Sequence, residues 1–167
     1  MYTYYIEETG YIFIEPIRSY DIDEVLEIEK LCFSVPWSEE SFRLEIEKNS
    51  FAKYLVAKHE GKVIGYGGMW LIVDESHITN IAIHPNYRRR GIGRVLLFSL
   101  MREAVKYKIK SMTLEVRVSN YAAQALYSEL GFVEGGIRKG YYADMQEDAL
   151  IMWNYDIEAT IRSFDRF

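Results

Sequence analysis

The most constraining part of the sequence is a strand-like segment that leads into a loop rich in glycine and arginine. Residues 81–94 read I-A-I-H-P-N-Y-R-R-R-G-I-G-R, and a helical apolar pattern continues to Tyr107. Glycine lets a backbone approach a ligand closely and adopt positive φ. The N–H groups of a first helical turn attract anions, and arginine makes bidentate contacts with phosphate. The stretch therefore predicts a site for a phosphate-bearing ligand.

Two familiar nucleotide-binding loops do not fit this stretch. A P-loop ends in Gly-Lys-Ser or Gly-Lys-Thr, whereas Gly93 is followed by Arg94. A dinucleotide fingerprint has glycine or alanine at its third conserved position, which Leu96 occupies here. On its own, the R-x-x-G-x-G spacing also fits a solvated arginine turn that caps a helix.

Size and composition restrict the class of protein. A chain of 167 residues is expected to form a single domain over residues 1–167. The net charge of −5 argues against a general nucleic-acid binder, and four arginines within residues 88–94 of an acidic chain suggest a small anionic ligand. No membrane span or signal peptide is apparent. A single cysteine, Cys32, and three scattered histidines predict neither disulfides nor a metal site, so a cytoplasmic location is expected.

Hydrophobic periodicity and capping residues predict a mixed α/β domain. Asp21, Ser38 and Asn120 are expected to cap helices. Strands are expected at 11–18, 53–59, 62–73, 76–83, 112–116, 132–137 and 149–153, and helices at 22–33, 38–48, 91–107 and 121–130. Residues 1–10 fit either an edge strand or a segment without regular structure, and the tail 155–167 gives no clear signal.

This order of elements, with R-x-x-G-x-G after the fourth strand, resembles the GNAT superfamily of acyl-CoA-dependent N-acetyltransferases. Several local matches are similar to one branch, the RimI-type ribosomal-protein-alanine N-acetyltransferases. They are Pro36-Trp37-Ser38, Asn80-Ile81-Ala82-Ile83, Arg88–Arg94, Leu114-Glu115-Val116-Arg117, Ser119-Asn120, Ala125-Leu126-Tyr127, Leu130-Gly131-Phe132, Tyr141-Tyr142 and Glu147-Asp148-Ala149. The matches cover about residues 12–154, which leaves 1–10 and 155–167 as extensions without an assigned role.

The resemblance implies a mostly antiparallel sheet of six or seven strands, splayed at its central strands and flanked by about four helices. It also implies acetyl-CoA as the co-substrate. The pantetheine arm would pair with Ile81, Ala82 and Ile83, and Asn120 would bind the cofactor beyond the diphosphate. The diphosphate would lie on Arg88, Arg89, Arg90, Gly91, Ile92, Gly93 and Arg94.

Acetyl transfer to an amine requires a base, because an α-amino group with a pKa of about 7.7–8.0 is mostly protonated near neutrality. The resemblance assigns this role to Glu115, acting directly or through a water. Burial is expected to raise the pKa of that carboxyl. The alternative is an outward Glu115 that pairs with Arg117 or Lys110.

The resemblance assigns Tyr127 as the acid that protonates the leaving thiolate. A phenol with a pKa of about 10 carries its proton at neutral pH. The alternative is a packing role, because Tyr127 lies on an apolar helical stripe. Tyr141 and Tyr142 are expected to cover the first residue of the substrate, and a backbone N–H near Ile83 is expected to hold the oxyanion. His77 and His84 are read as structural, with a proton relay as the other option.

The resulting hypothesis is a cytoplasmic enzyme that acetylates the N-terminal alanine of a small-subunit ribosomal protein. A basic peptide would complement an acidic enzyme, and neither direct nucleic-acid nor membrane binding is expected. One alternative acceptor is a lysine side chain or small amine. Another possibility is an acyl-CoA-binding regulatory module without turnover. The sequence does not fix the oligomeric state.

Overall fold

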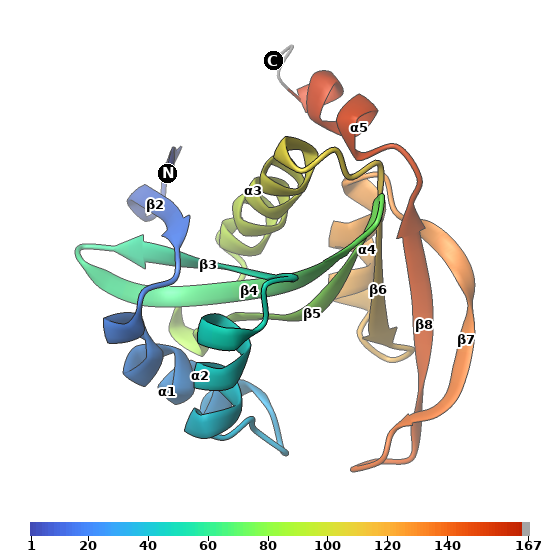
Figure 1. Ribbon diagram of the computed structural model, residues 1–167, viewed down its shortest axis with the longest axis horizontal. Helices are drawn as coiled ribbons and strands as arrows, with labels where there is room; N and C mark the ends of the chain where they lie inside the picture. The colour runs from blue at the N-terminus through green and yellow to red at the C-terminus, as the bar shows by residue number, and fades with distance from the viewer. Residues whose placement is uncertain (165–167) are drawn as a thin grey trace. The chain divides into compact units, whose positions relative to one another are not determined.

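The computed structural model describes residues 1–164 (Figure 1). The strands are β1 Tyr2–Ile6, β2 Gly10–Pro16, β3 Ala52–His59, β4 Lys62–Ile72, β5 Glu75–Ile83, β6 Ser111–Arg117, β7 Val133–Tyr142 and β8 Glu147–Asn154. The helices are α1 Ile22–Cys32, α2 Glu39–Lys48, α3 Ile92–Lys106, α4 Tyr121–Glu129 and α5 Ile157–Phe164, with short 3-10 turns at Ser19–Asp21 and Pro85–Tyr87. The strands are hydrogen-bonded in the order β1-β2-β3-β4-β5-β6-β8-β7.

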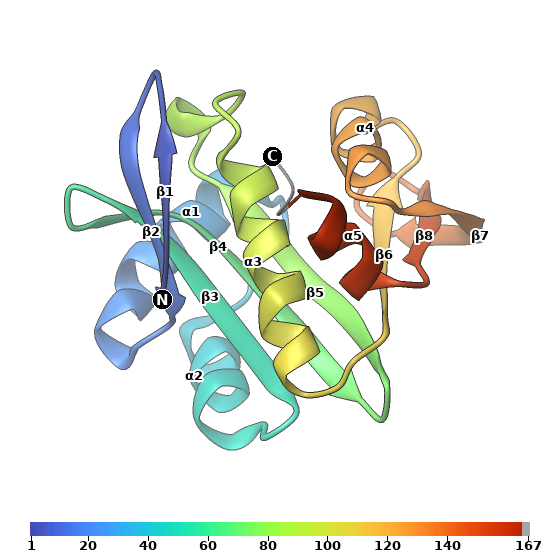
Figure 2. The same cartoon turned by 90° about the horizontal axis from the view of Figure 1, so that it is seen from above.

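The predicted mixed α/β fold with a mostly antiparallel sheet is confirmed, and β5 and β6 are a parallel pair within it. Both terminal extensions add an element. Residues 2–6, which the sequence left open, form β1 as an antiparallel partner of β2 (Figure 2). The tail forms α5, and its last three residues lie outside the described part of the chain.

The chain divides into two compact units, which are described separately. The first comprises Met1–Trp70 and Thr79–Leu100, and the second comprises Leu71–Ile78 and Met101–Phe167. Strand β5 therefore begins in the second unit and ends in the first.

In the first unit, α1 and α2 cover one face of β3 and β4, and α3 lies on the other face (Figure 1). Helix α1 buries a stripe at helical spacing, Ile22, Val25 and Ile28, against a core that includes Phe42. Tyr54 belongs to the same core, and Gly68 leaves room for its ring, because an added Cβ would lie 2.2 Å from that ring.

A buried carboxylate in the first unit holds the segment between α1 and α2. Glu29 accepts a hydrogen bond from the Tyr66 hydroxyl and another, of 3.0 Å, from the Trp37 backbone N–H. Burial raises the pKa of Glu29 despite the second of these bonds. Glu29 thus links the Pro36-Trp37-Ser38 segment to α1 and β4. The position of Glu29 in the helical sequence pattern does not predict this role.

In the second unit, β6 alternates between two environments. Met112, Leu114 and Val116 are buried, whereas Thr113 and Glu115 are on the opposite, half-buried face. Strand β8 pairs antiparallel with both β6 and β7, and β7 is an exposed edge strand.

Helix α4 ends in a glycine cap. Gly131 has a φ of +79°, and the Phe132 N–H donates to the Tyr127 carbonyl at 3.0 Å.

None of the helices within residues 1–164 has the length and apolar character to cross a membrane.

Candidate active site

The predicted phosphate loop lies in the first unit, between β5 and α3. Gly91 has a φ of +81°, and an added Cβ would have no atom within 4 Å, so the backbone is open to a ligand at this point. The first helical hydrogen bond of α3 runs from the Val95 N–H to the Gly91 carbonyl. The N–H groups of residues 92–94 therefore precede the intrahelical pattern, as the anion-binding hypothesis requires.

The arginines of this loop have different roles. Arg88 donates from Nε to the Ile83 carbonyl and from Nη2 to Cys32 Sγ, both at 3.1 Å. Arg88 thereby braces the loop against β5 and α1, where Cys32 is half-buried. Arg90 lies over the Tyr87 ring at 5.5 Å, whereas Arg89 is exposed with a φ of +63°.

Strand β5 presents backbone groups on the side away from β4. The His84 N–H donates to the Ile64 carbonyl of β4. Because successive residues alternate in hydrogen-bonding direction, Ala82 also faces β4, and the N–H groups of Ile81 and Ile83 face away. Within the described residues, pairing of β5 with β6 comprises three residue pairs and ends at His77.

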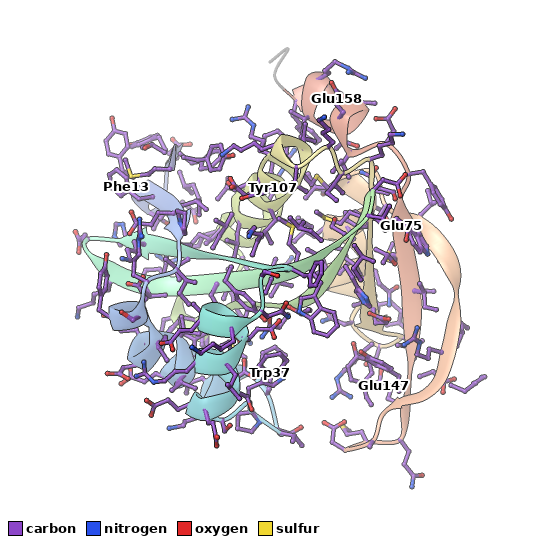
Figure 3. The ribbon with its side chains drawn as sticks, in the orientation of Figure 1. Phe13, Trp37, Glu75, Tyr107, Glu147 and Glu158 are labelled. Atoms are coloured by element: carbon purple, nitrogen blue, oxygen red, sulfur yellow. The ribbon has the colours of Figure 1, made fainter. Side chains whose placement is uncertain are left out.

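The second unit contains a pocket of about 290 Å³ around Glu115. Its lining residues are Ile72, Glu75, Ser76, His77, Thr113, Glu115, Arg138, Ile151 and Trp153, of which Glu75 is labelled in Figure 3. The side chain of Glu115 is 6% exposed. His77 Nε2 lies 2.6 Å from Glu115 Oε2, and Arg138 Nη1 lies 3.5 Å from Oε1. The alternative of an outward Glu115 paired with Arg117 or Lys110 is wrong.

The electrostatics of Glu115 also correct a prediction. Burial alone raises the pKa of this carboxyl, but the hydrogen bond from His77 and the charges of His77 and Arg138 lower it more. The pKa is therefore below its usual value and not above it, because the sequence did not reveal the two partners. Glu115 is a carboxylate at neutral pH and is able to accept a proton.

Tyr127 is buried on α4, and its ring centre lies 5.9 Å from that of Phe132. Burial raises the pKa of its phenol, with a smaller contribution from Tyr142. The side chain therefore packs as the structural alternative predicts, and it also keeps its proton at neutral pH as an acid must.

Tyr141 and Tyr142 form a perpendicular ring pair with centres 5.0 Å apart. The Tyr142 hydroxyl donates to the Glu115 backbone carbonyl at 3.4 Å, which brings this pair next to the pocket strand. The Arg117 guanidinium lies 4.1 Å from the centre of the Tyr142 ring. Burial raises the pKa of Tyr142 to about 12.

Arg117 is itself fixed by two carboxylates at the β7–β8 turn. Arg117 Nη2 donates to both carboxylate oxygens of Asp144, at 2.9 Å to Oδ1 and 2.7 Å to Oδ2. Glu147, labelled in Figure 3, accepts from Nη1 at 3.3 Å. The turn that follows the two tyrosines, which end β7, is thus ordered by the protein, whereas the tyrosines themselves belong to the strand.

Asn120 caps α4 as predicted, with Oδ1 accepting the Ala123 N–H at 3.2 Å. Its contact with a cofactor stays a prediction. In residues 1–164, no group of three or more His, Cys, Asp or Glu side chains is arranged to hold a metal ion.

Comparisons with known proteins give a consistent relationship. Residues 22–132 match the acetyltransferase (GNAT) family. A Bacillus subtilis (strain 168) protein, named provisionally as a ribosomal protein bS18-alanine N-acetyltransferase, is 46% identical over 140 residues, which cover 84% of this chain and 93% of that protein. The Escherichia coli (strain K12) ribosomal protein bS18-alanine N-acetyltransferase is 38% identical over 143 residues, with 83% and 94% covered.

A solved structure agrees with these sequence relationships. The crystal structure of the ribosomal-protein-S18-alanine N-acetyltransferase from Escherichia coli aligns with a TM-score of 0.78 at 36% identity, over 85% of this chain and 92% of that one. The chain belongs to the acetyltransferase (GNAT) family, and it is an N-acetyltransferase of the kind that the RimI-like sequence motifs indicate.

Proposed function

We propose that this protein transfers the acetyl group of acetyl-CoA to the N-terminal alanine of ribosomal protein bS18 in the cytoplasm. The ionised Glu115 beside His77, in a pocket large enough for the end of a peptide, carries the proposal. The names of the relatives support this acceptor. The whole chain, residues 1–167, acts as one catalytic domain in this proposal.

The donor is acetyl-CoA, which supplies a thioester carbonyl and a thiolate leaving group. The open backbone at Gly91 and the N–H groups that begin α3 bind its diphosphate, with charge from Arg89. The N–H group of Ile81 hydrogen-bonds its arm. The Ile83 N–H stabilises the oxyanion of the tetrahedral intermediate.

Two groups of the second unit move the protons. Glu115 accepts one proton from the α-ammonium, directly or through a water, while His77 holds Oε2 in place. The amine then attacks, so that an N–C bond forms and the C–S bond breaks. Tyr127 donates its proton to the departing thiolate, and the second proton of the acylated nitrogen returns to the Tyr127 phenolate. Tyr141 and Tyr142 cover the first residue of the acceptor.

The acceptor is tested by measuring thiol release from acetyl-CoA with two peptides. One begins with a free alanine followed by basic residues, and the other has a blocked N-terminus and an internal lysine. We expect release with the first peptide only, because a lysine with a pKa of about 10.4 is a harder amine to deprotonate. Release with the blocked peptide would move the assignment to lysine acetylation. Cofactor binding without release from any amine would indicate a regulatory module.

Gly91→Ala is expected to raise the KM for acetyl-CoA about tenfold. The added Cβ costs about 1–2 kcal/mol at positive φ and obstructs the approach of the diphosphate. Gly61→Ala is a matched control, because Gly61 has a φ of +80° and equally open surroundings in the β3–β4 turn. Steady-state kinetics should show a raised KM for the first variant alone. An equal KM in both would remove Gly91 from the binding site.

A further inference from the structure

The two oxygens of the Glu115 carboxylate have different surroundings. Oε2 is held by His77 at 2.6 Å, which is a short hydrogen bond. The ion pair of Oε1 is with Arg138 Nη1 at 3.5 Å, which is longer than a good hydrogen bond. Oε1 is therefore the oxygen that can accept a hydrogen bond from an incoming amine, and it has a guanidinium beside it.

An amine that binds Oε1 brings its own neighbouring groups to Arg138. In a peptide, the first carbonyl oxygen lies three covalent bonds from the α-amino nitrogen, at most about 4 Å away. That separation allows the amine to bind Oε1 while the carbonyl accepts a hydrogen bond from Arg138. A lysine side chain has four methylene groups next to its amine and offers no acceptor at this distance.

We propose that Arg138 binds the carbonyl oxygen of the acceptor's first residue and thereby selects α-amines of peptides over side-chain amines. This inference rests on the proposed function and assigns a specificity-determining residue to it. Arg138 contacts the substrate next to the reacting nitrogen but takes no proton.

The position of Arg138 suits such an exchange of partners. It lies on the edge strand β7, where the register with β8 shifts on either side of it, between Glu134 and Gly136 and between Arg138 and Tyr142. Its side chain is 53% exposed, and its guanidinium lies 5.4 Å from the centre of the Tyr141 ring. Stacking on that ring keeps the guanidinium near Glu115 without burying it.

The contrast with Arg117 supports this assignment. Arg117 is committed to Asp144 and Glu147 and is largely covered. Arg138 instead has one long contact with a carboxylate that the reaction itself requires. A guanidinium in that setting retains donors for a neutral oxygen, and a hydrogen bond from a charged donor is stronger than one between neutral groups.

The test replaces one atom of the acceptor. The alanine peptide is compared with the same peptide whose first carbonyl oxygen is replaced by sulfur, a weaker acceptor, and kcat/KM is measured for both. The wild type is expected to prefer the oxygen peptide by about 10-fold. In Arg138→Met the preference should fall below about twofold, because the donor is gone and only the amine's own reactivity remains. Arg138→Lys keeps the charge and should restore part of the preference.

Lys139→Met is the matched control, because Lys139 lies on the same strand but pairs with Asp148. It should keep the wild-type preference. If Arg138→Met lowers both rates equally and leaves the ratio unchanged, the residue has only a structural role and the inference is overturned. If the wild type fails to acetylate the alanine peptide at all, the proposed function fails instead. Binding of acetyl-CoA, measured by calorimetry, should be the same in all variants.

Discussion

Glu115→Gln is expected to lower kcat by about 10²–10⁴-fold and to leave the Kd for acetyl-CoA unchanged. The amide keeps the shape of the side chain and a hydrogen bond to His77, but it cannot accept the proton of the α-ammonium. Stopped assays of thiol release with the alanine peptide give the rate, and calorimetry gives the affinity.

Glu75→Gln serves as the control for this substitution, because Glu75 lines the same pocket and is exposed. It removes the same charge and should stay within about twofold of the wild type. Since the pKa of Glu115 is lowered, its carboxylate loses function only as the pH falls through that lowered value. Between pH 6 and 9, Glu115 is therefore ionised throughout, and its titration should add no limb to the wild-type pH–rate profile. Near-normal turnover in Glu115→Gln would remove this residue from the mechanism.

Tyr127→Phe is expected to lower kcat by a similar factor of about 10²–10⁴. The ring still packs against Phe132, so the midpoint of thermal unfolding should change little, whereas the proton for the leaving thiolate is lost. Because burial raises the pKa of this phenol, the wild type should keep its acid well into the alkaline range.

Tyr121→Phe is the corresponding control, since Tyr121 lies on the same helix and is exposed. The two variants are compared by thiol release and by thermal unfolding. If Tyr127→Phe turns over like Tyr121→Phe, Tyr127 is a packing residue and another group must protonate the thiolate.

Local patterns predicted most of the fold correctly. Ser38 and Asn120 cap helices as predicted. Asp21 precedes α1 but does not cap it, because its carboxylate accepts the Arg18 N–H and pairs with Lys58 instead. The Leu-Gly-Phe cap and the alternation of β6 are equally local. The sequence does not decide the structure of Tyr2–Ile6, because this short aromatic segment forms a strand only by pairing with β2.

The partners of Glu115 were not predictable in the same way. His77 reaches Glu115 because the parallel register places it opposite Thr113, two residues earlier on β6, and sequence spacing contains no such information. Arg138 depends on register shifts along β7, and a one-residue slip would turn its side chain to the other face. The predicted direction of the Glu115 pKa shift is wrong for this reason. The alternating pattern of β6 reveals the burial that raises the pKa, but it does not reveal His77 and Arg138, which lower it more.

The clamp of Arg117 between Asp144 and Glu147 has a consequence for how quickly an acceptor is captured. The ring of Tyr142 packs on Arg117, which is already immobilised. The Tyr142 side chain therefore loses its rotamer freedom when the chain folds and not when a peptide binds. Binding of an acceptor peptide therefore costs little further conformational entropy at Tyr142. Association should accordingly be limited by collision and orientation, without a slow rearrangement of the β7–β8 turn.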